Sequence, residues 1–185
     1  MRSGWCIWIT GLPGSGKSTV ANLLVKFLLQ KGIRAQLLSS DVLRKYLTPK
    51  PTYSLEERDI VYSTLVYIAW LLTQNGVNVV IDATGNLRRY RDNARKQIRK
   101  FMEVYLECPL EICIERESKR VETRYAPRQI YLRALEGKAP TVPGIGQPYE
   151  PPVSPEITVN TAQHTPEQAV QKILQVVLDR WCTKI

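Results

Sequence analysis

The sequence contains only one histidine, His164, and four cysteines among its 185 residues. The cysteines are Cys6, Cys108, Cys113 and Cys182, and no two of them have the C-x-x-C spacing of a structural zinc site. These shortages argue against a zinc centre. Because Cys6 and Cys108 lie in apolar runs, where a reduced cysteine behaves as a small hydrophobic residue, we expect a reducing, cytoplasmic location.

Three further absences limit the class of protein. No apolar run approaches the roughly 20 residues that span a bilayer. The first residues, MRSGWCIWIT, pass directly into a glycine-rich stretch, so we interpret them as a core strand and expect neither a signal peptide nor a membrane partner. The Asn-Lys-x-Asp segment with which GTPases read guanine is missing, and 185 residues are too few for a large ATPase. The length predicts a single domain over residues 1–185.

Positive charge, in contrast, is abundant and concentrated. The net charge is +9, which suits anionic ligands, including nucleotides and nucleic acid. The segment Asn86–Lys100, NLRRYRDNARKQIRK, holds seven Lys or Arg against one Asp and so carries +6 by itself.

Hydrophobic periodicity predicts strands that alternate with helices. The expected strands are Trp5–Thr10, Ala35–Ser39, Val77–Ala83, Phe101–Cys108 and Ile157–Asn160. The expected helices are Ser18–Gln30, one that starts after Ser54 and runs to about Asn75, one from about Arg88 to Lys100, Leu110 to about Lys119, and a last helix from Thr165. Capping boxes are predicted at Ser54 with Glu57 and at Thr165 with Gln168. This order favours a three-layer α/β fold with a mostly parallel five-stranded sheet.

A phosphate-binding loop follows the first expected strand. Gly11-x-x-x-x-Gly16-Lys17-Ser18 matches the Walker A pattern, between a buried strand and an amphipathic helix. Glycines let backbone N–H groups converge on phosphate oxygens, Lys17 provides a charge for the β- and γ-phosphates, and the Ser18 hydroxyl reaches Mg²⁺. The sequence therefore predicts a P-loop NTPase fold that binds ATP and Mg²⁺. Its predicted ATP-binding residues are Gly11, Leu12, Pro13, Gly14, Ser15, Gly16, Lys17, Ser18 and Thr19.

Two carboxylates follow the next two strands, at the sheet edge where α/β proteins bind ligands. Asp41 could accept the proton of an acceptor hydroxyl, or it could only cap a short helix. Asp82 could hold Mg²⁺ through water or act as the base, or it could cap the loop that follows it. With Lys17, these two are the candidate catalytic residues, and the sequence does not rank them.

Arginines are the candidates for binding an anionic acceptor, because a guanidinium pairs with two oxygens of phosphate or sulfate. Arg44, Arg58 and Arg88 are the substrate-binding candidates. Tyr53 could stack on a base, or it could form a hydrophobic staple before the Ser54 cap. An Arg-rich lid is expected at about 116–140. It holds Arg116, Arg120, Arg124 and Arg128, of which Arg116 is the preferred contact to the nucleotide.

Three segments resemble the adenylylsulfate kinase (APS kinase) family. They are GLPGSGKST, the stretch FMEVYLECPLEICIER, and GIGQPYEPPVSPEITVNT at Gly144–Thr161, whose spacing is not a general P-loop feature. The resemblance covers nearly the whole chain. It implies an ATP-dependent kinase of sulfate assimilation that phosphorylates the 3′-hydroxyl of adenosine 5′-phosphosulfate, and it allows a homodimer.

The resemblance also assigns acceptor residues. Asp41 and Arg44 match the second Asp and the Arg of the family's Asp-Gly-Asp-Asn-x-Arg motif. Arg58 matches the Arg of Phe-Ser-x-x-x-Arg, with Tyr53 in place of Phe. The chain departs from the family at Ser39, Val61, Val142 and the segment Thr84–Arg88, and by additional lid residues around Val121–Arg128.

Two alternatives remain open from the sequence. IDATGN followed by an Arg-rich helix resembles small P-loop kinases related to polynucleotide kinase and to the kinase of seryl-tRNA, and a basic stripe suits a nucleic-acid backbone. A non-catalytic ATP-binding protein is the third hypothesis.

Overall fold

A computed structural model of the chain describes residues 3–120 and 129–182. Its centre is a five-stranded sheet in which every neighbouring pair of strands is parallel. The strands are β1 (Cys6–Thr10), β2 (Ala35–Ser39), β3 (Asn78–Asp82), β4 (Phe101–Glu107) and β5 (Ile157–Asn160), in the order β2-β3-β1-β4-β5. The chain places strands first on one side of β1 and then on the other. The carboxyl ends at this switch point are where such sheets bind ligands.

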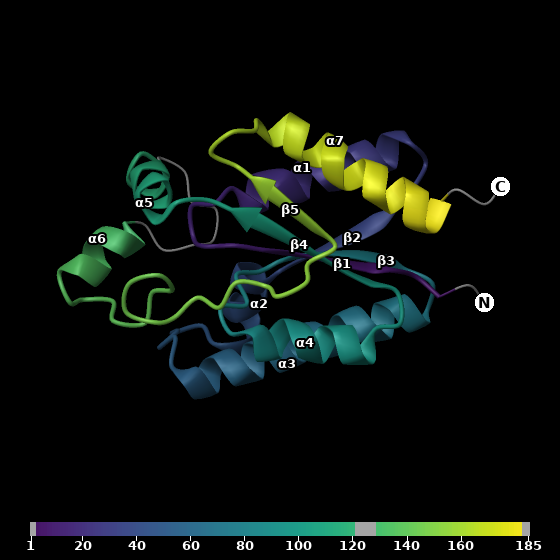
Figure 1. Cartoon of the computed structure of the whole chain (residues 1–185). Helices are drawn as coiled ribbons and strands as arrows, with labels where there is room; N and C mark the ends of the chain where they lie inside the picture. The colour runs from purple at the N-terminus through teal and green to yellow at the C-terminus, as the bar shows by residue number, and fades with distance from the viewer. Residues whose placement is uncertain (1–2, 121–128, 183–185) are drawn as a thin grey trace.

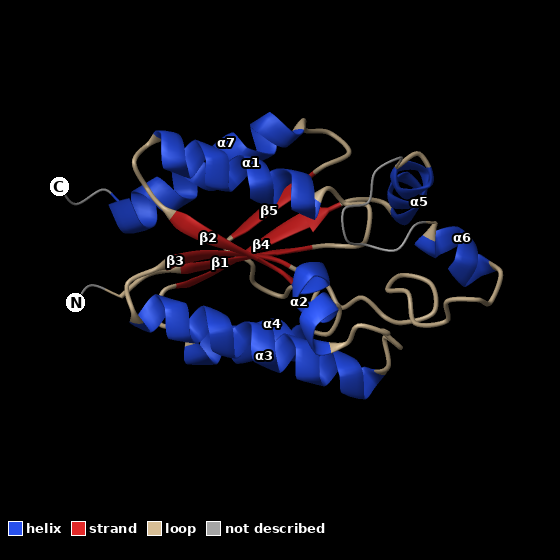
Figure 2. Cartoon of the chain, turned by 180° about the vertical axis from the view of Figure 1, so that it is seen from behind, coloured by secondary structure: helices blue, strands red, loops and turns tan. Residues whose placement is uncertain are grey.

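Helices cover both faces of the sheet, as Figures 1 and 2 show. One face carries α1 (Lys17–Gln30) and α7 (Pro166–Val177), which continues into a π-helical turn, η1 (Leu178–Cys182). The other face carries α3 (Leu55–Gln74) and α4 (Arg88–Gln97). Three shorter helices, α2 (Ser40–Leu47), α5 (Leu110–Ser118) and α6 (Ile130–Leu135), lie toward the carboxyl ends of the strands. The predicted three-layer α/β fold is confirmed. No described helix is long and apolar enough to cross a membrane.

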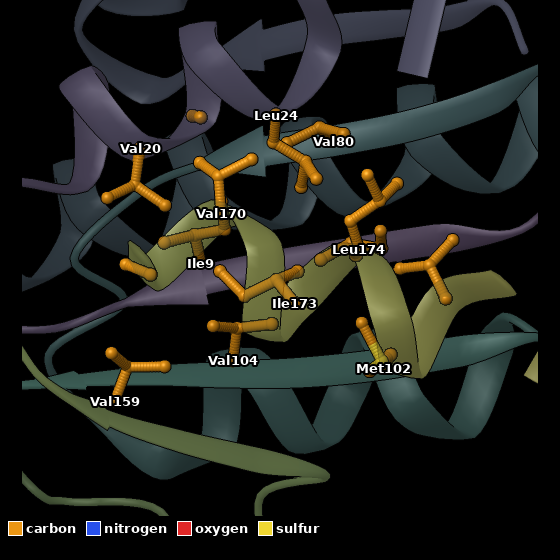
Figure 3. Packing of buried hydrophobic residues seen from close by; sticks show 14 of the residues in the cluster. Ile9, Val20, Leu24, Val80, Met102, Val104, Val159, Val170, Ile173 and Leu174 are labelled. Atoms are coloured by element: carbon orange, nitrogen blue, oxygen red, sulfur yellow. The ribbon is translucent and has the colours of Figure 1, made fainter. Parts of the chain in front are cut away.

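Alternation along β1 divides the core into two clusters. Ile7 and Ile9 face α1 and α7, where they pack with residues such as Leu24 and Ile173 (Figure 3). Cys6 and Trp8 point the other way, toward α3 and α4. Because β1 is buried on both faces, its position is fixed from both sides, and the loop that follows it starts from a rigid support.

The boundaries differ from the predictions in places. β1 begins at Cys6 rather than Trp5, β3 is shorter than expected at both ends, and α4 ends at Gln97, three residues before the predicted end. The capping box at Thr165 is confirmed. At Ser54 only half of the box forms: the Ser54 hydroxyl accepts from the Glu57 N–H, but the Glu57 carboxylate bonds Arg44 and Thr52 instead. The Glu57 side chain thus forms a tertiary ion pair with Arg44 and does not complete the capping box.

Candidate active site

A pocket of about 830 Å³ opens at the carboxyl edge of the sheet. Its lining comes from the P-loop, α2, the segment 51–58, the end of β3, and the segments 116–120 and 130–143. The P-loop and α2 each follow a strand of the sheet directly, and residues 116–140 are the predicted lid. This volume is typical of ligand sites.

The P-loop has the geometry that phosphate binding requires. Gly14 and Gly16 both have positive φ, 81° and 93°, which glycine adopts at little cost. A Cβ at Gly14 would lie 2.4 Å from the carbonyl oxygen of Cys113, so this position also needs glycine for space. The loop ends at the N-terminus of α1, which favours an anion.

Lys17 lies at the base of the pocket, 9% exposed, and its Nζ donates to the Leu12 carbonyl over 2.9 Å. Burial lowers the pKa of Lys17, and the carboxylates of Asp82 and Asp41 partly oppose this. The structure therefore brings together the three candidate catalytic residues. The Lys17 cation therefore shares one pocket with both carboxylates.

Asp82 ends β3 and is buried, at 7% exposed. Burial raises the pKa of its carboxyl group, while Lys17 and a hydrogen bond with the Ser18 hydroxyl act in the opposite direction. Asp82 is therefore influenced by the hydroxyl that is predicted to bind Mg²⁺, and both residues line the pocket. No group of three or more His, Cys, Asp or Glu side chains within residues 3–120 and 129–181 could hold a metal ion. Any metal here would draw further ligands from water and phosphate, as Mg²⁺ usually does.

Asp41 is not a helix cap. Ser39 occupies the N-cap of α2, and Asp41 lies in the first turn of that helix while it lines the pocket. The predicted capping alternative is wrong because α2 begins directly at the end of β2, earlier than the sequence pattern suggested. An acidic residue in the first turn also interacts favourably with the helix dipole.

The acceptor arginines are buried and already partnered. Arg44 is 6% exposed and pairs with Glu57, and its guanidinium lies 4.8 Å from the centre of the Tyr53 ring. Arg58, also 6% exposed, donates to Tyr53 O at 3.1 Å, Asn86 Oδ1 at 3.3 Å and the Thr141 carbonyl at 2.6 Å. Arg44, Arg58 and Tyr53 all line the pocket.

The staple alternative for Tyr53 is wrong. The residue that a staple would contact is Arg58, four positions after the Ser54 cap, and it is not hydrophobic. The Tyr53 ring packs against Arg44 instead. The stacking hypothesis for Tyr53 stays a prediction.

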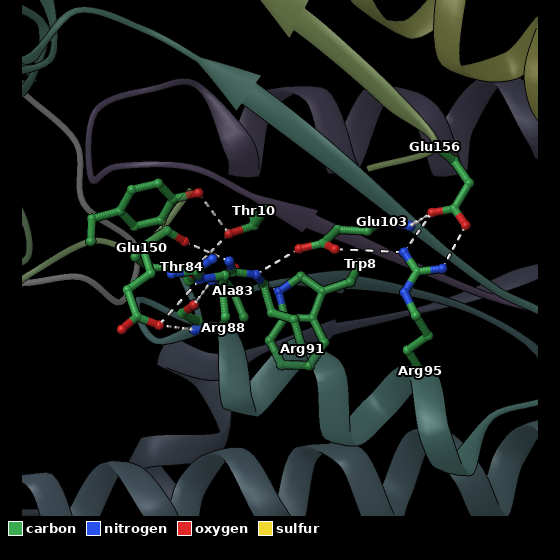
Figure 4. Close-up of polar contacts among 12 residues, drawn as sticks. Trp8, Thr10, Ala83, Thr84, Arg88, Arg91, Arg95, Glu103, Glu150 and Glu156 are labelled. Carbon is green, nitrogen blue, oxygen red and sulfur yellow. Dashed lines mark hydrogen bonds and ion pairs between the residues drawn. The ribbon is translucent and has the colours of Figure 1, made fainter. Parts of the chain in front are cut away.

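Arg88 does not line the pocket, contrary to the prediction. Its backbone N–H donates to Glu150 Oε2 over 2.7 Å, and its half-exposed guanidinium faces the same carboxylate at 3.7 Å. The other arginines of α4 are paired too: Arg89 with Asp59, Arg91 with Glu103, and Arg95 with Glu156, as Figure 4 shows for Arg91 and Arg95. Most of the positive side chains of α4 are therefore paired with carboxylates. This weakens the argument that α4 presents a basic stripe to a nucleic-acid backbone.

The buried ion pair on α4 predicts a stability effect. Arg91 is 1% exposed, and its Nε lies 2.6 Å from Glu103 Oε1. Replacing Arg91 with Leu leaves a buried carboxylate without its main partner, which typically costs about 3–5 kcal/mol of unfolding free energy. Arg88→Leu breaks an exposed pair and should cost no more than about 1 kcal/mol. Urea unfolding of both variants measures the difference, and equal losses would contradict the assignment.

Some of the arginines of the predicted lid line the pocket, and others lie outside the described residues. Arg116 lines the pocket, and its guanidinium donates to the Thr161 carbonyl over 2.7 Å and to the Thr161 hydroxyl over 3.3 Å. Arg120 and Arg133 line the pocket as well. Arg124 and Arg128 lie outside the described residues. Arg116 thus lines the pocket, and its contact with the nucleotide stays a prediction.

Sequence reasoning missed several residues that build the site. Glu57 was assigned only to helix capping, and Asn86 had no role although it bonds Arg58 and the Pro148 carbonyl. Tyr149, from the Pro-Tyr-Glu motif, bonds the Thr10 hydroxyl over 3.0 Å at the end of β1. That motif was the available signal: its spacing marked the loop as specific, and the structure shows that it braces the strand before the P-loop.

Comparisons with known proteins agree with this geometry. The family model for adenylylsulphate kinase matches residues 3–160. A probable adenylyl-sulfate kinase of Pyrococcus abyssi is 35% identical, over 93% of this chain and 94% of its own length. An adenylyl-sulfate kinase of Rippkaea orientalis is 37% identical, with 94% and 91% covered.

Solved structures give the same result. The APS kinase of Mycobacterium tuberculosis in complex with AMPPNP and APS superimposes with a TM-score of 0.84 and 31% identity, over 96% of this chain and 99% of that one. A shikimate kinase of Acinetobacter baumannii in complex with shikimate, 20% identical with a TM-score of 0.60, shows the shared fold alone. With a family model that matches most of its length and relatives above 30% identity, this chain belongs to the adenylylsulfate kinase family.

Proposed function

We propose that this protein transfers the γ-phosphoryl group of ATP to the 3′-hydroxyl of adenosine 5′-phosphosulfate. The products are ADP and 3′-phosphoadenosine 5′-phosphosulfate. One observation carries the proposal: a single pocket joins the P-loop and Lys17 to the family's acceptor pair, Asp41 and Arg44. The relative of known structure was solved with an ATP analogue and APS together.

The ATP phosphates would bind at residues 11–19, with Arg116 from α5 beside the nucleotide. Ser18 and Asp82 fit Mg²⁺, because a hydroxyl and a carboxylate oxygen are hard ligands and both line the same pocket. When bound, Mg²⁺ would neutralise part of the negative charge of the phosphates. Lys17 would add a positive charge beside the transferred group from the other side.

On the acceptor side, Asp41 would orient the 3′-hydroxyl and accept its proton. Arg44 and Arg58 would provide donors toward the phosphosulfate anion, although part of each guanidinium is already occupied. Tyr53 would offer its ring to the purine. Positioning of two bound substrates supplies much of the acceleration in such transfers. Cytoplasmic location and a homodimer stay predictions from the sequence.

A coupled assay of ADP release tests the function directly. With ATP and Mg²⁺ present, we expect ADP release that depends on adenosine 5′-phosphosulfate, and a 3′-phosphorylated product detectable by mass spectrometry. A short RNA with a free 5′-hydroxyl and seryl-tRNA, assayed in parallel, should give no transfer. ATP binding without transfer to adenosine 5′-phosphosulfate would refute the proposal, and transfer to either RNA would favour the other kinase group.

A further inference from the structure

Glu57 connects three segments of the acceptor side without lining the pocket itself. It is 8% exposed and lies in the first turn of α3. Its Oε1 accepts from Arg44 of α2 and, over 3.3 Å, from the Thr48 hydroxyl. Its Oε2 accepts from the N–H and the hydroxyl of Thr52, at 2.5 and 2.7 Å, and from the Tyr53 N–H at 3.1 Å. Five donors therefore converge on one carboxylate.

Tyr53, one of these donors, has an unusual backbone. Its φ is +56°, and Gln129 is the only other non-glycine residue with positive φ in the described parts of the chain. Such a conformation persists only when its surroundings hold it in place. Here the Tyr53 N–H is bound by Glu57 and its ring lies against Arg44, which Glu57 also binds.

Arg44 depends on the same carboxylate. It is buried, and Glu57 is the only carboxylate that pairs with it among the described side chains. An ion pair with good geometry fixes the plane of a guanidinium, and so fixes where its free N–H groups point. Without Glu57, the Arg44 guanidinium and the Tyr53 ring would both lose the carboxylate that fixes their positions.

Helix capping does not explain this arrangement. The Ser54 hydroxyl already caps α3 by accepting from the Glu57 N–H over 3.2 Å. The Glu57 carboxylate turns away from the helix end, toward α2 and the segment before α3. Burial alone would raise the pKa of Glu57, but the hydrogen bonds from Thr52 and the charge of Arg44 outweigh it and lower the pKa. The group is thus ionised at neutral pH.

We infer that Glu57 is a positioning residue of the acceptor site: it holds Arg44 and Tyr53 in the orientations that bind the acceptor nucleotide. The inference rests on the proposed function. Glu57 does not line the pocket itself, and it binds Arg44 and Tyr53, so its effect should fall on acceptor binding. The P-loop and Lys17 make no contact with it, so ATP binding should stay unchanged.

Glu57→Gln tests this with little change in shape. Both oxygens of Glu57 face groups that can only donate, namely the Arg44 guanidinium on one side and the N–H groups of Thr52 and Tyr53 on the other. The amide nitrogen of Gln must therefore face a donor in either orientation. We expect KM for adenosine 5′-phosphosulfate to rise roughly 10- to 100-fold, as loss of hydrogen bonds to a charged group implies, with KM for ATP unchanged.

Glu56→Gln is the matched control. Glu56 is the preceding residue, is exposed, and lies in the same first turn of α3. It removes the same charge near the helix N-terminus, so KM for both substrates should stay at the wild-type value. A purely structural role of Glu57 would lower the melting temperature without the selective change in acceptor KM, and that result overturns the inference.

A second variant covers the case in which Glu57→Gln does not fold. Thr52→Val removes one hydrogen bond to Oε2, together with the one that the Thr52 hydroxyl accepts from the exposed Ser54 N–H, and leaves the pair with Arg44 intact. We expect acceptor KM to rise roughly 2- to 10-fold, and an unchanged value would overturn the inference. Failure of the proposed function shows separately, since wild-type protein would then release no ADP in response to adenosine 5′-phosphosulfate.

Discussion

Asp41→Asn is expected to lower kcat by roughly 10²- to 10⁴-fold, the range typical of a lost general base. The side chain keeps its shape and its place in the first turn of α2, but it can no longer take the proton of the attacking hydroxyl. KM for ATP should change little, because the residues of the P-loop that would bind its phosphates stay intact. Steady-state kinetics at saturating ATP and Mg²⁺ measure the loss, and Asp92→Asn, an exposed residue of α4, is the control.

The variant Asp82→Asn distinguishes the role of Asp82 from that of Asp41. Asp82 ends β3 and interacts with the Ser18 hydroxyl, whereas Asp41 lies on α2, the helix that also carries Arg44. If it serves Mg²⁺, its variant should need a higher Mg²⁺ concentration for half-maximal rate and recover part of kcat when Mg²⁺ is raised. The assignment is reversed if Asp41→Asn keeps near-normal turnover while Asp82→Asn stays inactive at every Mg²⁺ concentration.

The nucleotide half of the site could be predicted because its information is local. Gly11 to Thr19 form one continuous segment, and the strand before it and the helix after it are both visible as hydrophobic patterns. The glycine conformations follow from the need for close backbone approach at Gly14. The same holds for the sheet, since alternation of strands and helices implies parallel pairing.

The acceptor half could be predicted only in part, because its side chains depend on partners far away in the sequence. Arg88 has a suitable charge and follows β3 in the sequence. In the structure it is bound by Glu150, 62 residues later, and does not line the pocket. Arg58 is bound by a carbonyl of the loop after α6. Glu57 fits a capping box in the local sequence, but in the structure its carboxylate accepts hydrogen bonds from Arg44 and Thr52 instead. The sequence shows which residues are charged. Only the fold decides which of these side chains pair with each other and which stay available to a substrate.

Lys17→Met is expected to reduce kcat/KM by on the order of 10³-fold, the upper range for loss of one preorganised electrostatic group in a site that excludes water. Lys17 is buried in the pocket that Asp41 and Asp82 also line, and its Nζ is held by the Leu12 carbonyl, so an exposed cation cannot take its position. Lys26→Met, on the exposed side of α1, is the matched control and should leave the rate unchanged. Equal loss in both variants would point to damage of the helix rather than of the site.

The pH dependence of Lys17→Met makes the test sharper. Burial raises the pKa of Asp82, and Lys17 is the strongest influence that lowers it. Without Lys17 the pKa of Asp82 should rise further, so the carboxylate becomes protonated at a higher pH as the solution is acidified. If the residual activity needs ionised Asp82, the acid limb of the rate profile must therefore move to higher pH than in the wild type. Because the Ser18 hydroxyl also lowers that pKa, Ser18→Ala should move the limb in the same direction by a smaller amount. An acid limb that stays in place in Lys17→Met would mean that ionised Asp82 is not required for transfer.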